Sequence, residues 1–148
     1  MSKIKEIDLL EVGIKELNKT LQRRDQNNFS DFNVINPMGA HAIATGLTSD
    51  VKVNINGHVG YYCAGMNKNS SIIIHGNAGV GVAENMMSGK VIVKGDASQS
   101  AGAAGHGGML VIEGNASARC GISMKGIDII AKDIKNFKAT NIFHLAIY

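Results

Sequence analysis

The chain repeats one short phrase of apolar and polar residues. Each copy reads apolar, any residue, apolar, polar, glycine, polar, small, and the phrase recurs every 19 residues. Its glycines are Gly57, Gly76, Gly95 and Gly114. Alternation of apolar and polar positions predicts a strand with one buried face. The glycine, or the Asn or Asp beside it, is expected to supply the positive φ of a corner. Four copies at a fixed interval predict a solenoid with one strand per coil.

The same alternation predicts which side chains point into the solenoid. We expect two interior columns, four and two residues before each glycine. The first column holds Val53, Ile72, Val91 and Leu110, and the second holds Ile55, Ile74, Val93 and Ile112. A weaker coil is expected before these four, because Val34-Ile35-Asn36 stands 19 residues before Val53-Asn54-Ile55.

The interval restricts the type of solenoid. Leucine-rich repeats need a ladder of leucine and asparagine that this chain lacks, and helical repeats need about 33 residues or more. A hexapeptide β-helix needs multiples of six. The interval therefore favours an all-β fold, a right-handed parallel β-helix with 19-residue coils. Small residues six and seven positions after the glycines predict that each coil is narrow there. These residues are Cys63, Val82, Ala101 and Cys120, then Ala64, Ala83, Gly102 and Gly121.

Both ends of the chain differ from the repeats. Apolar residues at helical spacing predict a short N-terminal α-helix from near Gly13 to near Arg23. The tail KDIKNFKATNIFHLAIY has no glycine, and Asp133 stands where a fifth ladder glycine would fall. We therefore expect three regions: a helical arm over residues 1–30, the β-helix over 31–131, and a diverged tail or cap over 132–148.

Composition and charge narrow the function classes. A chain of 148 residues with 45% hydrophobic residues can form one domain with a sizeable core. The net charge of +3 is dispersed, which does not favour binding to nucleic acid or to an anionic membrane. The sequence has no 18-residue apolar run and no signal-peptide core. We expect a cytoplasmic protein.

Three motifs suggest chemistry, and each has a structural explanation. Gly76, Gly79 and Gly81 resemble a nucleotide-binding loop, but the repeat accounts for Gly76 and no helical pattern follows. Cys63 and Cys120 fall in one column three coils apart, about 14 Å at the spacing of stacked strands, which is beyond disulfide reach. Both are expected to be buried, reduced and unreactive.

The histidines form the third motif. His58 and His75 lie on either side of a corner and are expected at the surface, with a metal pair as the less favoured alternative. No nucleophile with a base at recognisable spacing is present. We therefore predict no catalytic, cofactor-binding or metal-binding residue.

Two stretches carry a family resemblance. They are GHVGYYCAGMNKNS and GNAGVGVAENMMSGKVIVKGDASQSAGAAGHGGMLVIEGNASARCGISMKG. They resemble the GXGXG-motif domain over roughly residues 33–130. That domain forms the C-terminal part of the glutamate synthase large subunit, and it occurs as a stand-alone subunit in glutamate synthase-like and N-methylglutamate synthase-like complexes. It is found more distantly in formylmethanofuran dehydrogenase. The resemblance implies a right-handed β-helix without catalytic residues.

The resemblance also implies a role in nitrogen metabolism. The chain would be a non-catalytic scaffold of a glutamate synthase-like oxidoreductase, with a flavin-containing synthase subunit and a glutamine amidotransferase subunit as partners. Such a complex transfers glutamine-derived ammonia to a flavin site. No cofactor is expected on this chain itself. The alternatives are an independent small hydrolase or redox enzyme that uses Cys63 or Cys120, and a scaffold like the one in formylmethanofuran dehydrogenase.

One surface is expected to meet a partner. The strand alternation points the position between the two interior columns outward, and this position holds Asn54, Ile73, Ile92, Val111 and Ile130. Such an apolar stripe is rarely left bare, so either the N-terminal helix or a partner should cover it. We predict a homo-oligomer. Its interface would use Ile73, Ile92, Val111 and Ile130, or tail residues such as Phe137 and Phe143.

Overall fold

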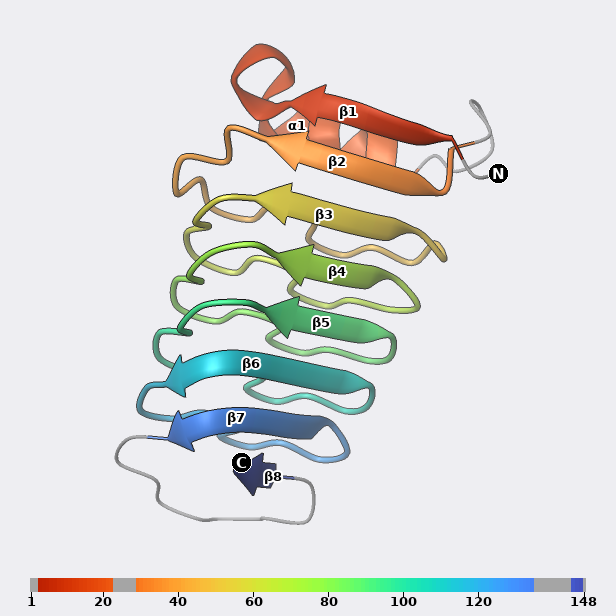
Figure 1. Cartoon of the computed structure of the whole chain (residues 1–148). Coiled ribbons are helices and arrows are strands. Elements are labelled where there is room, and N and C mark those ends of the chain that lie inside the picture. The colour runs from red at the N-terminus through yellow and green to blue at the C-terminus, as the bar shows by residue number, and fades with distance from the viewer. Residues whose placement is uncertain (1–2, 23–28, 135–144, 148) are drawn as a thin grey trace.

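The computed structural model describes residues 3–22, 29–134 and 145–147. It shows a right-handed parallel β-solenoid with one sheet whose strands follow chain order (Figure 1). The strands are β1 (Ile4–Asp8), β2 (Asp31–Ile35), β3 (Lys52–Asn56), β4 (Ser71–Ile74), β5 (Lys90–Val93), β6 (Met109–Ala116), β7 (Asp128–Ile134) and β8 (Leu145–Ile147). The helix α1 (Leu9–Gln22) connects β1 to β2. The fold class expected from the repeat is confirmed.

The two interior columns are also confirmed. Val53, Ile72, Val91 and Leu110 pair in register from β3 to β6, and Ile129 on β7 extends the column. The second column runs from Ile55 through Ile74, Val93 and Ile112 to Ala131. All these side chains are fully buried. The aliphatic columns therefore form the core, and each coil packs on the coils before and after it.

The predicted register of the first coil is wrong by two residues. Val34 pairs with Ile55, and Phe32 pairs with Val53, so this coil advances by 21 residues. A slip of two positions leaves the same side chains on the inner face of a strand. The alternation therefore could not distinguish the two registers. The observed one buries the large Phe32 ring beside Val53.

The ladder glycines have a different role from the one expected. Gly57 has a φ of 142°, but Gly76, Gly95 and Gly114 do not have positive φ. They are required because stacked coils approach closely. A Cβ on Gly76 would lie 2.7 Å from the carbonyl carbon of Gly57. Gly95 and Gly114 each donate a backbone hydrogen bond of 3.0 Å to the glycine of the preceding coil.

Left-handed backbone occurs instead in the turns opposite the sheet. Three alternating residues in each coil have positive φ, for example Tyr62 at 59°, Ala64 at 57° and Met66 at 55°. The Ala64 N–H bonds the carbonyl of Ile43 in the preceding coil, whereas the N–H groups of Tyr62 and Met66 bond carbonyls in the following coil. This turn therefore bonds the coils on both sides of it, and these hydrogen bonds offset the cost of left-handed backbone.

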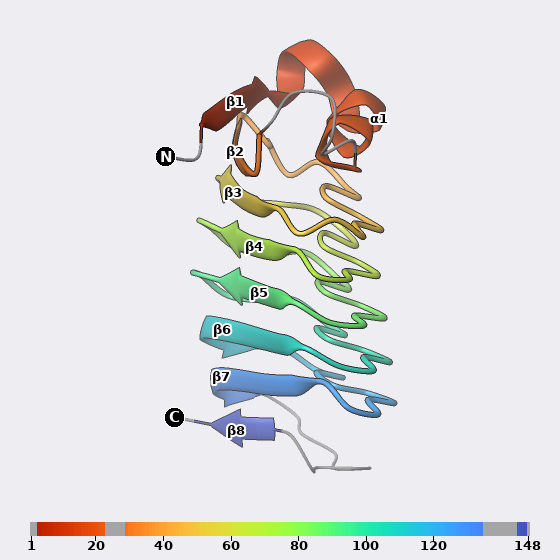
Figure 2. The ribbon, with the colours of Figure 1, turned by 90° about the vertical axis from the view of Figure 1, so that its right-hand side faces the viewer.

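The helix α1 covers the N-terminal end of the solenoid rather than the stripe on the sheet (Figure 2). Its side chains Leu17 and Leu21 are fully buried, whereas Leu10 is 69% exposed. Gly13, with a φ of 76°, interrupts the helical backbone, so the regular helix after it agrees with the predicted start. The segment before the helix also forms β1, which pairs with β2.

The C-terminal part of the sheet continues past the repeats. A register shift between Ile112 and Asn115 makes Asn115 pair with Asp133. Asp133 therefore does not have to stack on Gly114, which explains how the coil tolerates an aspartate there. The strand β8 then pairs with β7 through Ile129, Ile130 and Ala131.

Candidate interaction surfaces

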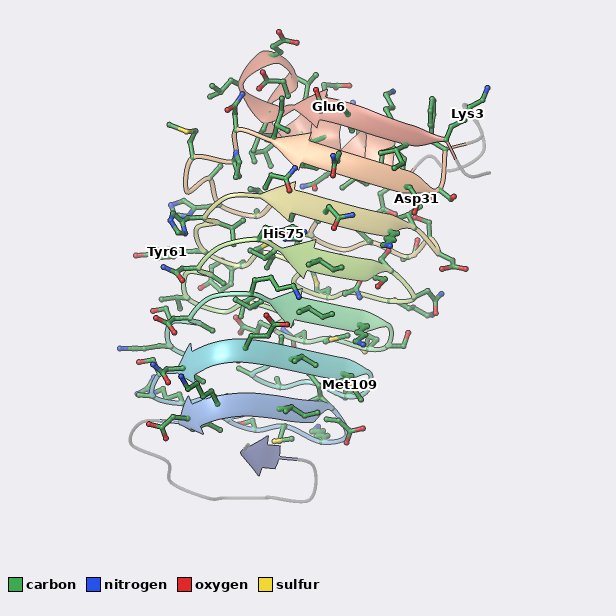
Figure 3. All side chains as sticks on the ribbon, viewed as in Figure 1. Lys3, Glu6, Asp31, Tyr61, His75 and Met109 are labelled. Carbon is green, nitrogen blue, oxygen red and sulfur yellow. The ribbon has the colours of Figure 1, made fainter. Side chains whose placement is uncertain are left out.

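The outward face of the sheet carries the predicted apolar stripe. Ile73, Ile92, Val111 and Ile130 lie side by side on four consecutive strands, and we call these four residues the outer stripe. Each is partly exposed. Asn54 on β3 pairs with Ile73 and ends the stripe on the N-terminal side. Figure 3 shows this face toward the viewer.

Polar side chains flank the outer stripe. Lys94, directly after β5, forms a salt bridge with Glu113 on β6, with 2.8 Å between Nζ and Oε1. Their side chains are 42% and 41% exposed, so this ion pair contributes little to stability. On the other side of the stripe the same two strands carry Lys90 and Met109. The surface is therefore apolar at its centre with charged groups along its edges.

A second surface is aromatic. The rings of His41 and Tyr61 stack with centroids 4.5 Å apart, and Tyr61 meets Tyr62 edge to face at 6.4 Å. The Tyr61 N–H donates to His41 Nδ1 at 2.7 Å, which fixes the imidazole. Both tyrosines are about half exposed, at 51% and 50%. We call these three residues the aromatic cluster; Tyr61 lies at the edge of the sheet where the strands end (Figure 3).

Sequence reasoning missed the aromatic cluster because its members come from two coils. His41 lies in the first coil, where the 19-residue interval fails. The adjacent tyrosines Tyr61 and Tyr62 were the available signal, since aromatic residues are otherwise rare, at 5% of the chain.

Polar side chains at the corner after the glycines form a hydrogen-bonded ladder. His58 Nδ1 accepts from the N–H of Asn77 at 2.9 Å, and Asn77 Oδ1 accepts from the N–H of Asp96 at 2.9 Å. Asp96 Oδ1 accepts in turn from the N–H of Asn115 at 2.8 Å. These residues therefore hold successive coils in register.

The two histidines beside this corner have separate partners. His75 Nε2 lies 3.0 Å from Asn54 Oδ1, while His58 is hydrogen-bonded within the ladder. Within residues 3–22, 29–134 and 145–147, no three His, Cys, Asp or Glu side chains are grouped to hold a metal ion.

The two cysteines are buried in the solenoid wall. Both are free thiols, and burial raises the pKa of Cys63 to about 12 and the pKa of Cys120 to about 11. A raised pKa leaves little thiolate, which is the nucleophilic form. Their environment therefore disfavours the alternative of an enzyme that uses either thiol.

The remaining predicted site residues fall into two groups. The ladder glycines Gly57, Gly76, Gly95 and Gly114 form the tight corner described above. Phe137 and Phe143 lie outside the described residues. The structure thus brings together the four sheet residues of the predicted interface.

Part of the chain is similar to Protein GlxC of Rhizobium meliloti (strain 1021). The two are 58% identical over 62 residues, which is 41% of this chain and 27% of that protein. The likeness is consistent with a GXGXG-type family. The matched stretch thus spans about a quarter of the relative's length. No protein-family profile matches the chain, and no solved structure matches it. None of the helices in the described part of the chain is long and apolar enough to cross a membrane.

Proposed function

We propose that this chain is a non-catalytic scaffold subunit of a glutamate synthase-like oxidoreductase complex in the cytoplasm. Its partners would be a flavin-containing synthase subunit and a glutamine amidotransferase subunit. The observation that carries the proposal is the 58% identity to Protein GlxC over 62 residues, together with the GXGXG-type resemblance of the repeats. The coupling role itself is our inference.

The aromatic cluster supports a scaffold role and suggests where a partner binds. Tyr61 and Tyr62 are half exposed, although each could bury a large apolar surface. Tyrosine is enriched among the residues that contribute most of the binding energy at the centres of protein interfaces. His41 holds Tyr61 in a stacked position, so its ring is ordered before binding. Ordering in the free state lowers the entropic cost of association.

The rigidity of the solenoid also suits a scaffold. Interior columns, glycine corners and turn hydrogen bonds connect every coil to the next. A solenoid built from such nearest-neighbour contacts presents surfaces at fixed distances from one another. Two enzymes bound to different coils would therefore be held in a fixed relative position.

Purification from the native organism tests the proposal. We expect the tagged chain to capture a flavoprotein and a glutamine amidotransferase, identified by mass spectrometry and by flavin absorbance of the eluate. The double variant Tyr61→Ser and Tyr62→Ser should lose both partners, whereas Lys68→Ser, an exposed substitution away from the aromatic rings, should retain them. Glutamine hydrolysis or amine oxidation by the isolated chain would contradict the proposal. Capture of formylmethanofuran dehydrogenase components would favour the more distant family instead.

A further inference from the structure

The outer stripe lies at the centre of the sheet face and has a sharp polar boundary. Ile92 on β5 and Val111 on β6 form its middle, with Ile73 and Ile130 on either side. Asn54 and Asn33 continue the same outward column toward the N-terminus. The helix α1 packs on the N-terminal end of the solenoid and does not cover the stripe (Figure 2). The apolar surface therefore stays accessible in the described fold.

The charged residues beside the outer stripe are arranged so that a two-fold axis would pair opposite charges from two copies. We propose that the outer stripe is the interface between two copies of this chain, related by an axis along the strands between β5 and β6. This rotation exchanges β5 with β6, so Ile92 faces Val111 of the second copy and Ile73 faces its Ile130. It also places Lys94 opposite Glu113 of the second copy and Glu113 opposite its Lys94. The intrachain pair thus becomes a network of four alternating charges.

The other face-to-face arrangement is disfavoured. An axis parallel to the solenoid would bring each strand opposite the same strand of the second copy. Lys90 and Lys94 lie on opposite sides of Ile92 along the chain. In this arrangement Lys90 of one copy would face Lys94 of the other copy. Like charges placed opposite each other in an interface disfavour that pairing. The two lysines beside Ile92 therefore favour antiparallel solenoid axes.

The size of the surface sets the expected affinity. Strands about 4.8 Å apart, with three outward residues each, give a face of roughly 400 Å² per copy. Two copies would then bury roughly 800 Å², below the size of standard stable interfaces. The dimer should therefore be weak and depend on concentration, with a dissociation constant on the order of micromolar.

Sedimentation equilibrium of the purified full chain, from about 1 to about 100 µM, tests the interface. We expect a reversible monomer–dimer equilibrium. The double variant Ile92→Thr and Val111→Thr keeps β-branched side chains on the strands and should raise the dissociation constant at least tenfold. Asn54→Thr, on the same face beyond the stripe, should leave it unchanged. Circular dichroism verifies that all variants are folded. A chain that stays monomeric throughout, or a dimer that the double variant leaves intact, would overturn the proposal.

A charge-exchange experiment tests the symmetry. Lys94→Glu leaves only acidic groups at positions 94 and 113 of both copies, and Glu113→Lys leaves only basic groups at these positions, so each variant alone should dimerise less than the parent. A mixture of the two should form a heterodimer, because each charge then faces its opposite. Dimers of the parent with no heterodimer in the mixture would rule out this axis. These measurements use the chain alone, so they stand apart from the capture of enzyme partners. A synthase subunit that requires Ile92 and Val111 for binding would assign the stripe to that partner instead.

Discussion

The side chain of Asn18 on α1 accepts a hydrogen bond from the backbone N–H of Ala44 at 2.9 Å. In later coils the corresponding N–H bonds a carbonyl of the preceding coil, as Ala64 does with Ile43 at 3.0 Å. The first coil has no such turn before it. Asn18 supplies the missing acceptor, and its Nδ2 donates to the carbonyl of Ala42 at 2.9 Å. The helix therefore replaces a coil in hydrogen bonding as well as in apolar packing.

Removing this amide should destabilise the N-terminal end. We expect Asn18→Ala to lower the free energy of unfolding by about 1–3 kcal/mol, because two part-buried backbone groups lose their partner. Urea denaturation measures the change. Thr20→Ala, which removes an exposed bond to the Glu16 carbonyl, should change it by about 0.5 kcal/mol or less. Equal effects of the two substitutions would show that α1 does not cap the solenoid in this way.

Alanine substitutions at two neighbouring positions of β4 should differ sharply in how much stability they remove. Ile74 is fully buried in the second interior column, while Ile73 lies on the outward face. We expect Ile74→Ala to cost about 2–5 kcal/mol through lost burial and the cavity that remains. Ile73→Ala should cost about 1 kcal/mol or less in the monomer. Thermal or chemical denaturation at low protein concentration compares them, and a larger loss at Ile73 would contradict the observed register.

The sequence predicts the strands and the core because both depend on a pattern that repeats. Val53, Ile72 and Val91 occupy equivalent positions, so a single register explains all of them. The first coil lacked that constraint, and a slip of two residues left its inner face unchanged.

The turns were less predictable for a different physical reason. Tyr62, Ala64 and Met66 are left-handed although none of them prefers that conformation. Hydrogen bonds to the coils on both sides impose it. Of the candidate surfaces, the outer stripe followed from alternation, whereas the stacking of His41 on Tyr61 depends on the irregular first coil.

A methyl group at a ladder glycine should be costly even where φ is ordinary. The Cβ in Gly76→Ala would lie 2.7 Å from backbone atoms of Gly57. The corner is also held in place, because the Gly76 carbonyl accepts from the Gly95 N–H and the Asn77 N–H donates to His58. We expect a loss of about 2–4 kcal/mol. Gly39→Ala is the comparison, because its φ is +70° but no atom lies within 4 Å of its Cβ. That strain alone should cost about 1–2 kcal/mol. If Gly39→Ala were the more damaging change in urea denaturation, close stacking would not be what requires glycine in the ladder.

The buried thiols should be unreactive in the folded protein and should weaken it in alkali. Burial raises the pKa of Cys63 from the ordinary 9.0 to about 12, so the folded state holds its proton where the unfolded state releases it. The stabilisation from this neutral thiol is complete below pH 9.0 and is lost as the pH rises through about 12. We expect Cys63→Ala to show a smaller loss of stability than the parent between these pH values. At neutral pH, a disulfide reagent should label the native chain slowly and the urea-unfolded chain rapidly. Fast labelling of Cys63 in the native state would contradict its burial and would restore the thiol as a candidate nucleophile.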